Sequence, residues 1–158
     1  MISPVTGEVI FSDGLRFRPH EPLRASHIRD ACSHTQLPIP GWTQHLLGVH
    51  SSDHGSFEVE AVSDRDSRIQ AVLVSHSHYF YQPGTPDDLE RRVFHEGVIG
   101  ADLHGQREFP WGEAFCKLDT AHNQDWLVVI YTVGPQVPLH HAELRRYLYA
   151  HASLSENR

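Results

Sequence analysis

The sequence predicts an α+β domain with a mainly antiparallel sheet of five to seven strands and about three helices packed largely on one face. Three observations lead to this fold class. Apolar and charged residues alternate over residues 57–61, as in a strand with one solvated face. Residues 71–74 and 126–131 are unbroken apolar runs, typical of central strands covered on both faces. Strand-like segments also follow one another directly, which argues against the strict β–α alternation of a parallel sheet.

The first elements in chain order are a β-hairpin and a short helix. Residues 8–11 and 15–17 flank Ser12-Asp13-Gly14, whose composition favours a turn between two strands. A helix is expected over residues 22–32, because Pro22 suits the first helical turn and apolar residues follow at helical spacing.

Three strands are expected next, over residues 42–50, 57–61 and 68–75. The polar segments 51–55 and 64–67 separate them and have the composition of turns. Short turns between consecutive strands predict an antiparallel meander.

The clearest helix start lies at Thr85, which can cap a helix, followed by Pro86 at the first helical position. The acidic residues that follow suit the positive end of the helix dipole. Leu89 and Val93 are predicted to face inward, and Gly97 is the expected stop.

Two strands and a helix complete the predicted fold. The strands cover residues 113–119 and 126–133, the second of them central. The last helix is expected over residues 139–152, where Leu144 and Leu148 lie on one face.

Length and charge limit the classes of function. A chain of 158 residues fits a single globular domain, residues 1–158. Its 13 Lys and Arg against 20 Asp and Glu give a net charge of −7 with neutral histidines. An acidic surface argues against nucleic-acid binding, which needs basic patches, and favours a basic protein partner. No segment approaches the roughly 18 apolar residues of a membrane span, so we expect no membrane association.

The N-terminus and the cysteines indicate a cytoplasmic protein. Residues 1–5 lack the basic start and apolar segment of a secretory signal. Cys32 and Cys116 have no C-x-x-C partner and are interpreted as reduced core residues, with a disulfide between them left open. Cys116 alternates with apolar residues, which favours a place in the core. No cofactor is expected.

His76 and His78 end the apolar strand and form the most suggestive chemical pair. Positions i and i+2 of a strand point to the same face, so both imidazoles can reach one ion. The segment resembles the start of the metallo-β-lactamase motif His-x-His-x-Asp-His, but Phe80 and Tyr81 replace its Asp and third His. Zinc needs three or four protein ligands, so structural or surface histidines are the preferred interpretation. A metal-dependent or acid/base hydrolase using His76 and His78 is the alternative.

Other catalytic motifs are incomplete. His95-Glu96 lacks the second histidine of a zincin because residue 99 is Ile. The His-x-Ser pairs of two-histidine phosphoesterases, at His50 and His151, are expected by chance among 14 histidines. These observations favour a protein without enzymatic activity, although acid/base catalysis needs no sequence signature. A response to pH through the histidines is a third possibility.

Aromatic and acidic residues are the candidates for partner binding. Phe109 and Trp111 lie in a predicted loop, and aromatic residues dominate binding hot spots. The favoured interpretation of Trp111, however, is that it packs over the sheet and orders that loop. The carboxylates expected in exposed turns and at the helix start are Asp64, Asp66, Asp87 and Asp88.

The hairpin Gly7-Glu8-Val9-Ile10-Phe11-Ser12-Asp13-Gly14-Leu15, the acidic charge and the lack of a complete catalytic motif give the chain a family resemblance. It resembles the small cytoplasmic immunity proteins of bacterial antagonism systems, which accompany type VI and polymorphic toxins. The resemblance implies a stoichiometric inhibitor that covers the active site of a basic toxin. Steric occlusion aided by carboxylates is therefore the first hypothesis for function.

Overall fold

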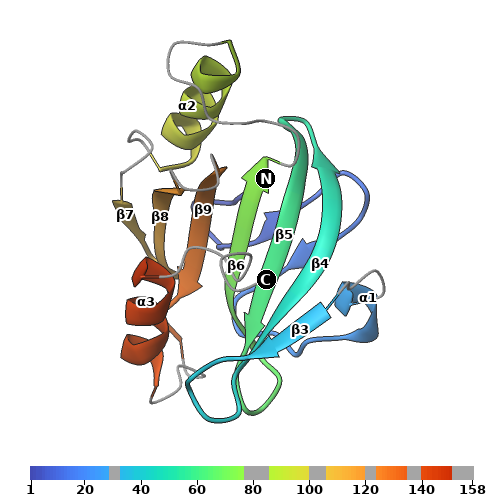
Figure 1. The fold of residues 1–158 in the computed structure, drawn as a ribbon, viewed down its shortest axis with the longest axis vertical. Coiled ribbons are helices and arrows are strands. Elements are labelled where there is room, and N and C mark those ends of the chain that lie inside the picture. Colours follow the sequence, from blue (N-terminus) through green and yellow to red (C-terminus); the bar gives the residue numbers. More distant parts are fainter. Residues whose placement is uncertain (29–32, 77–85, 100–105, 120–123, 135–139, 151–158) are drawn as a thin grey trace.

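A seven-stranded antiparallel sheet forms the centre of the computed structural model, which describes residues 1–28, 33–76, 86–99, 106–119, 124–134 and 140–150 (Figure 1). Its strands in spatial order are β3 (Ser33–Gln36), β4 (Thr43–Ser52), β5 (Gly55–Ser63), β6 (Ile69–His76), β9 (Gln124–Tyr131), β8 (Gly112–Asp119) and β7 (Gln106–Phe109). The remaining elements are the two-stranded sheet of β1 (Val9–Ile10) and β2 (Arg16–Phe17) and the helices α1 (Ala25–Ile28), α2 (Pro86–Ile99) and α3 (His141–Ala150). The predicted α+β fold class is confirmed.

The predicted meander is confirmed as β4, β5 and β6, paired antiparallel in sequence order. All eight residues of β6 are buried, because β5 and β9 pair with its two edges and both of its faces are covered. The chain then leaves the sheet, passes through α2 and returns as β7, β8 and β9, so that β9 pairs with β6.

Neither of the two edge strands of the sheet, β3 and β7, was predicted. The four residues of β3 are all exposed, and β7 has three exposed residues followed by the half-buried Phe109. Strands of this kind carry no hydrophobic alternation, which is the signal that predicts strands from sequence. Polar, short edges are a common means of preventing sheets from pairing with other molecules.

A different element covers each face of the sheet (Figure 1). Helix α3 and residues 37–42 pack on one face, where Leu144 and Leu148 are fully buried as predicted. Burial of a leucine side chain contributes about 1.5–3 kcal/mol. The two-stranded sheet packs on the other face and contributes Val9 and Phe17 to a second core.

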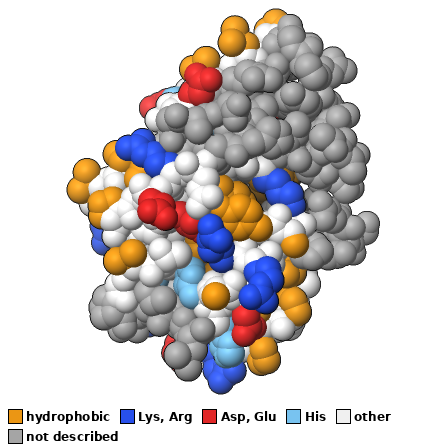
Figure 2. All heavy atoms as spheres, turned by 90° about the vertical axis from the view of Figure 1, so that its left-hand side faces the viewer, with side chains coloured by type: hydrophobic (Ala, Val, Ile, Leu, Met, Phe, Trp, Pro, Cys, Tyr) orange, Lys and Arg blue, Asp and Glu red, His pale blue; other side chains and the backbone are white. Residues whose placement is uncertain are grey.

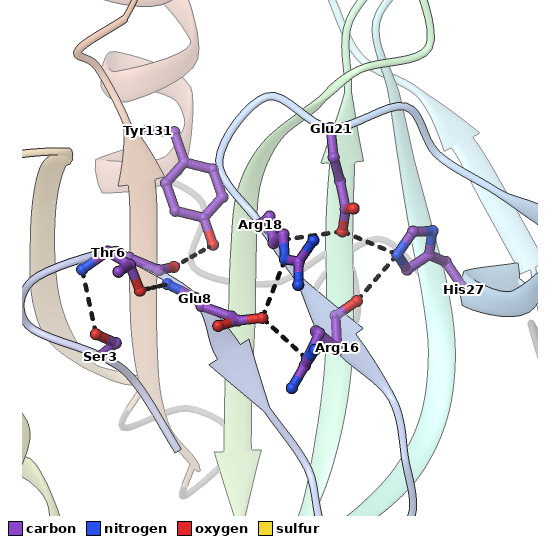
Figure 3. A network of polar contacts seen from close by, with 9 residues as sticks. Ser3, Thr6, Glu8, Arg16, Arg18, Glu21, His27 and Tyr131 are labelled. Atoms are coloured by element: carbon purple, nitrogen blue, oxygen red, sulfur yellow. Dashed lines mark hydrogen bonds and ion pairs between the residues drawn. The ribbon is translucent and has the colours of Figure 1, made fainter.

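Polar contacts fix the two-stranded sheet on the main sheet (Figure 3). The Tyr131 hydroxyl of β9 donates a 2.8 Å hydrogen bond to the Gly7 carbonyl. Burial raises the pKa of Tyr131, so the phenol stays protonated and remains a donor. At the surface, one Glu8 oxygen lies 2.9 Å from Arg16 Nε and 3.1 Å from Arg18 Nε.

Helix α2 presents the opposite face from the one predicted. Leu89 and Val93 are 63% and 61% exposed, whereas Phe94 and His95 are buried. Successive residues of a helix are rotated by about 100°, so a buried side centred between Phe94 and His95 leaves Val93 on the outward side. The helix also continues past Gly97 to Ile99.

Helix α1 begins at Ala25, three residues after the predicted start. Pro22 instead forms an isolated antiparallel bridge with Arg68. The predicted continuation to Cys32 lies outside the described residues. No helix in the described ranges is long and apolar enough to cross a membrane.

Candidate functional site

Four polar side chains meet on the face of the sheet that carries β1 and β2, near the end of the sheet where α2 lies. They are His76 of β6, His95 of α2, Cys116 of β8 and Asp125 of β9, and all are buried. Pairing of Val74 with Leu127 in the β6–β9 ladder sets positions 76 and 125 side by side on one face. We call these four residues the polar cluster.

His95 bridges two members of the polar cluster. Its Nε2 lies 2.5 Å from Asp125 Oδ2, and its Nδ1 lies 2.8 Å from Cys116 Sγ. His76 Nδ1 lies 3.8 Å from the same carboxylate oxygen. The ring of His76 packs 4.4 Å from Phe57 and 5.4 Å edge-on from Phe94, measured between centroids, so aromatic rings border the cluster.

The contacts of His95 assign its protons. A carboxylate only accepts hydrogen bonds, so Nε2–H of His95 donates to Asp125. Nδ1 of the neutral ring is then the acceptor, and the Cys116 thiol donates to it. A histidine that accepts a thiol proton while a carboxylate fixes its ring is the arrangement that activates cysteine nucleophiles.

The polar cluster does not have the geometry of a metal site. Asp125 and Cys116 contact opposite nitrogens of the His95 ring, so their donor atoms do not converge on one point. Among the residues the structure describes, no group of three or more His, Cys, Asp or Glu is arranged to hold a metal ion. His78 lies outside these residues, whereas His76 lies in the core rather than at the surface.

Asp64 does not belong to an exposed surface, contrary to the prediction. It is 7% exposed, because its carboxylate organises the turn between β5 and β6. Oδ1 accepts hydrogen bonds from the backbone N–H groups of Asp66 and Arg68, each at 2.9 Å, and Oδ2 accepts from the Gln70 amide at 2.8 Å. Three donors therefore hold this carboxylate within the fold.

The other predicted carboxylates do not form one surface. Asp66 is exposed in the β5–β6 turn, next to the start of β6. Asp87 and Asp88 lie in the first turn of α2, near the opposite end of the sheet, and their side chains are outside the described part of the structure (Figure 1). Strand β6, about 25 Å long at about 3.3 Å for each of its eight residues, runs between the two ends of the sheet at which these places lie.

Phe109 lies partly at the surface, whereas Trp111 lies in the core. Trp111 is only 5% exposed, so it packs over the sheet, which was the favoured interpretation, and it is not an exposed anchor for a partner. Its ring stacks on Phe109 at 4.7 Å between centroids, and its indole N–H donates to the Pro4 carbonyl at 3.2 Å. Phe109 is half-buried above it.

Phe109 lines a pocket of about 270 Å³ next to α2. Other walls come from Val93 and Phe94 of α2, from Arg107 of β7 and from the N-terminal residues Met1 and Ile2. The pocket therefore joins the exposed side of α2 to the edge strand β7.

Sequence reasoning recognised Cys116 as a core residue, set His95 aside as part of an incomplete zincin motif, and did not find Asp125. Asp125 directly precedes the apolar run of β9, and strand alternation from Leu127 places it on the same face as Tyr131. The buried position of His95 was missed because the inward face of α2 was assigned to other residues. Comparisons with protein-family models, curated proteins and solved structures find no match to this chain.

Proposed function

We propose that this chain is a binding protein that recognises another protein through α2, most concretely an immunity-type inhibitor that occludes a toxin. The observation that supports this proposal most is the exposure of Leu89 and Val93 on α2. These residues lie four positions apart and so share one stripe of the helix. Exposed apolar residues beside a pocket are typical of protein interaction sites. We call Leu89, Val93 and the pocket residues Arg107 and Phe109 the α2 surface.

Helix α2 is anchored beneath this surface, which favours binding. Phe94 packs into the core at 5.1 Å from Phe57 between ring centroids, and His95 bonds to β8 and β9 through the polar cluster. Because a helix held in this way needs no reordering on association, less conformational entropy is lost when a partner binds.

Charge suggests the class of partner. The chain carries a net charge of −7, and the start of α2 contains Asp87, Asp88 and Glu90. Acidic groups around an apolar contact speed association with a basic protein. Figure 2, which shows the side of the molecule with β7 and α3, has Lys and Arg side chains interspersed with Asp and Glu. The acidic start of α2 is therefore the proposed source of electrostatic steering.

The first prediction concerns toxicity and binding. In the experiment, each product of the genes that flank this chain's own gene is expressed by itself. We expect one of these products to stop growth unless this chain is co-expressed. Leu89→Asp and Val93→Asp should each weaken binding of that toxin at least tenfold, since aromatic and aliphatic hot spots contribute about 2 kcal/mol or more. Calorimetric titration measures the affinity and the 1:1 stoichiometry.

The control is Val49→Asp, because Val49 is 53% exposed on β4 and does not belong to the α2 surface. It should bind like the unmodified chain. Lack of protection against every flanking product would disprove the inhibitor proposal. Equal losses of affinity in the Val49 and Val93 variants would show that the α2 surface is not the contact.

A further inference from the structure

We propose that Cys116, His95 and Asp125 form a nucleophilic thiol site that accepts an acyl group from a small activated ester or thioester. This activity goes beyond partner binding by the α2 surface and does not depend on it. The three residues come from β8, α2 and β9, so the site exists only in the folded chain. Each has a defined role: nucleophile, base and positioning residue.

The geometry meets the requirements of an activated nucleophile. Such a site needs a nucleophile in hydrogen-bond contact with a base, and a third group that orients the base. Cys116 Sγ and His95 Nδ1 are 2.8 Å apart, and His95 Nε2 and Asp125 Oδ2 are 2.5 Å apart. The two contacts use opposite nitrogens of one ring, so a proton taken from the thiol leaves an imidazolium that the carboxylate stabilises.

The surroundings of the site strengthen these interactions. Phe94 packs against His76 edge-on and also contacts the ring of His95, at 5.2 Å between centroids. Aromatic walls lower the local dielectric constant, which strengthens the attraction between a thiolate, an imidazolium and a carboxylate. Within the described part of the chain, His76 of β6 also faces Asp125, with its Nδ1 3.8 Å from Asp125 Oδ2.

We place the acyl donor in the pocket beside α2, whose lining residues neighbour the site but do not include Cys116, His95 or Asp125 themselves. Phe94, the residue before His95, lines this pocket. Arg107, another lining residue, pairs with Ala114, and Cys116 follows two residues later on the same face of β8. Cys116 retains 5% exposure, and a volume of about 270 Å³ limits the donor to a small molecule.

The reaction has two half-steps. In the first, Cys116 Sγ attacks the carbonyl carbon of the ester while the thiol proton moves to His95 Nδ1. The C–S bond forms, the C–O bond to the leaving group breaks, and His95 returns the proton to the departing oxygen. In the second, water attacks the thioester with His95 as base, releasing the carboxylic acid and restoring the thiol.

Acylation by p-nitrophenyl acetate tests this proposal. A Cys32→Ser background leaves Cys116 as the single thiol, because the chain has two cysteines. We expect a burst of nitrophenol approaching one equivalent per chain and an acetyl group on Cys116 in the peptide mass spectrum. His95→Gln should slow the burst by about 100-fold or more, since general-base assistance contributes at least that factor. Cys116→Ser should abolish it.

Alkylation of Cys116 by iodoacetamide gives a second measurement, which can be made with His95 and Asp125 unchanged. An ordinary thiol reacts faster as pH rises toward about 8.5, whereas a thiol that passes its proton to a neighbouring imidazole forms a reactive thiolate already below pH 7. We expect Cys116 to follow the second profile, and Asp125→Asn to shift it toward the first. Labelling of Cys116 only after addition of urea would overturn the proposal. The proposal would also be overturned if Cys116 in the folded Cys32→Ser protein showed the pH dependence of an ordinary thiol. This measurement decides the question even if the His95 or Asp125 variants do not fold.

Discussion

Asp64 and Asp66 show how one turn can hold two carboxylates with opposite roles. Both belong to a segment whose composition predicts a turn, and that prediction is confirmed. Only Asp64 points inward, where it accepts three hydrogen bonds, while Asp66 is exposed. Residue type alone does not distinguish them, because the difference arises from the Gln70 amide that β6 brings beneath the turn.

Substituting each carboxylate separately tests this difference. Asp64→Ala leaves the Gln70 amide and two backbone N–H groups without their acceptor, so we expect a loss of about 2–3 kcal/mol in the free energy of unfolding. Asp66→Ala should change it by less than about 0.5 kcal/mol, as is usual for exposed positions. Urea denaturation measures both variants. Equal stability of the two would contradict a structural role for Asp64.

Among the elements, α2 illustrates the limits of prediction from sequence. Its start was predicted correctly, because capping chemistry is local: Pro86 begins the helix. Its inward face was not, since Leu89 and Val93 have helical spacing and the sequence offers no view of the surface that α2 covers. Phe57 and His76 present a shape that Phe94 fills, and this tertiary contact decides the orientation.

The polar cluster was beyond prediction for the same reason. Its residues come from four elements, and their meeting depends on the β6–β9 pairing and on the rotation of α2. The central strands, by contrast, were predicted because their apolar runs are long. The edge strands β3 and β7 escaped because exposed residues at an edge carry no such signal.

A pair of adjacent substitutions tests the orientation of α2. Phe94→Ala removes a ring that is 4% exposed and should lower the free energy of unfolding by about 3–5 kcal/mol. Val93→Ala, at the exposed neighbour, should lower it by less than about 0.5 kcal/mol. Thermal unfolding monitored by circular dichroism compares them. A larger loss of stability in the Val93 variant would support the orientation of α2 that was predicted from the sequence.

For the molecule as a whole, its histidines connect stability to pH. Burial lowers the pKa of His141 and of His45, and His34 adds charge repulsion at His45. Both groups ordinarily titrate near 6.5. Their lowered pKa values mean that the unfolded chain binds protons more readily than the folded one as pH falls below that value. Acid therefore favours the unfolded state at these two positions.

We accordingly expect the free energy of unfolding to decrease as pH falls from 7 through 6.5. The decrease should level off below the lowered pKa values of the folded state. His45→Gln combined with His141→Gln should make this dependence shallower, and urea titrations at a series of pH values measure the difference. An unchanged slope in the double variant would exclude both histidines as its source. Around His141, charge repulsion from His20 lowers its pKa further, whereas the Glu113 carboxylate acts in the opposite direction.

The hydrogen bond between Tyr131 and Gly7 has a consequence for how the chain folds. It spans 124 residues, and it fixes the first strands on a face of the sheet that β9 completes near the end of the chain. That face must stay open to water until β9 has paired with β6. Closing so large a loop late is slow, so the last step of folding is expected to set its rate and to leave the longest exposure to aggregation during synthesis.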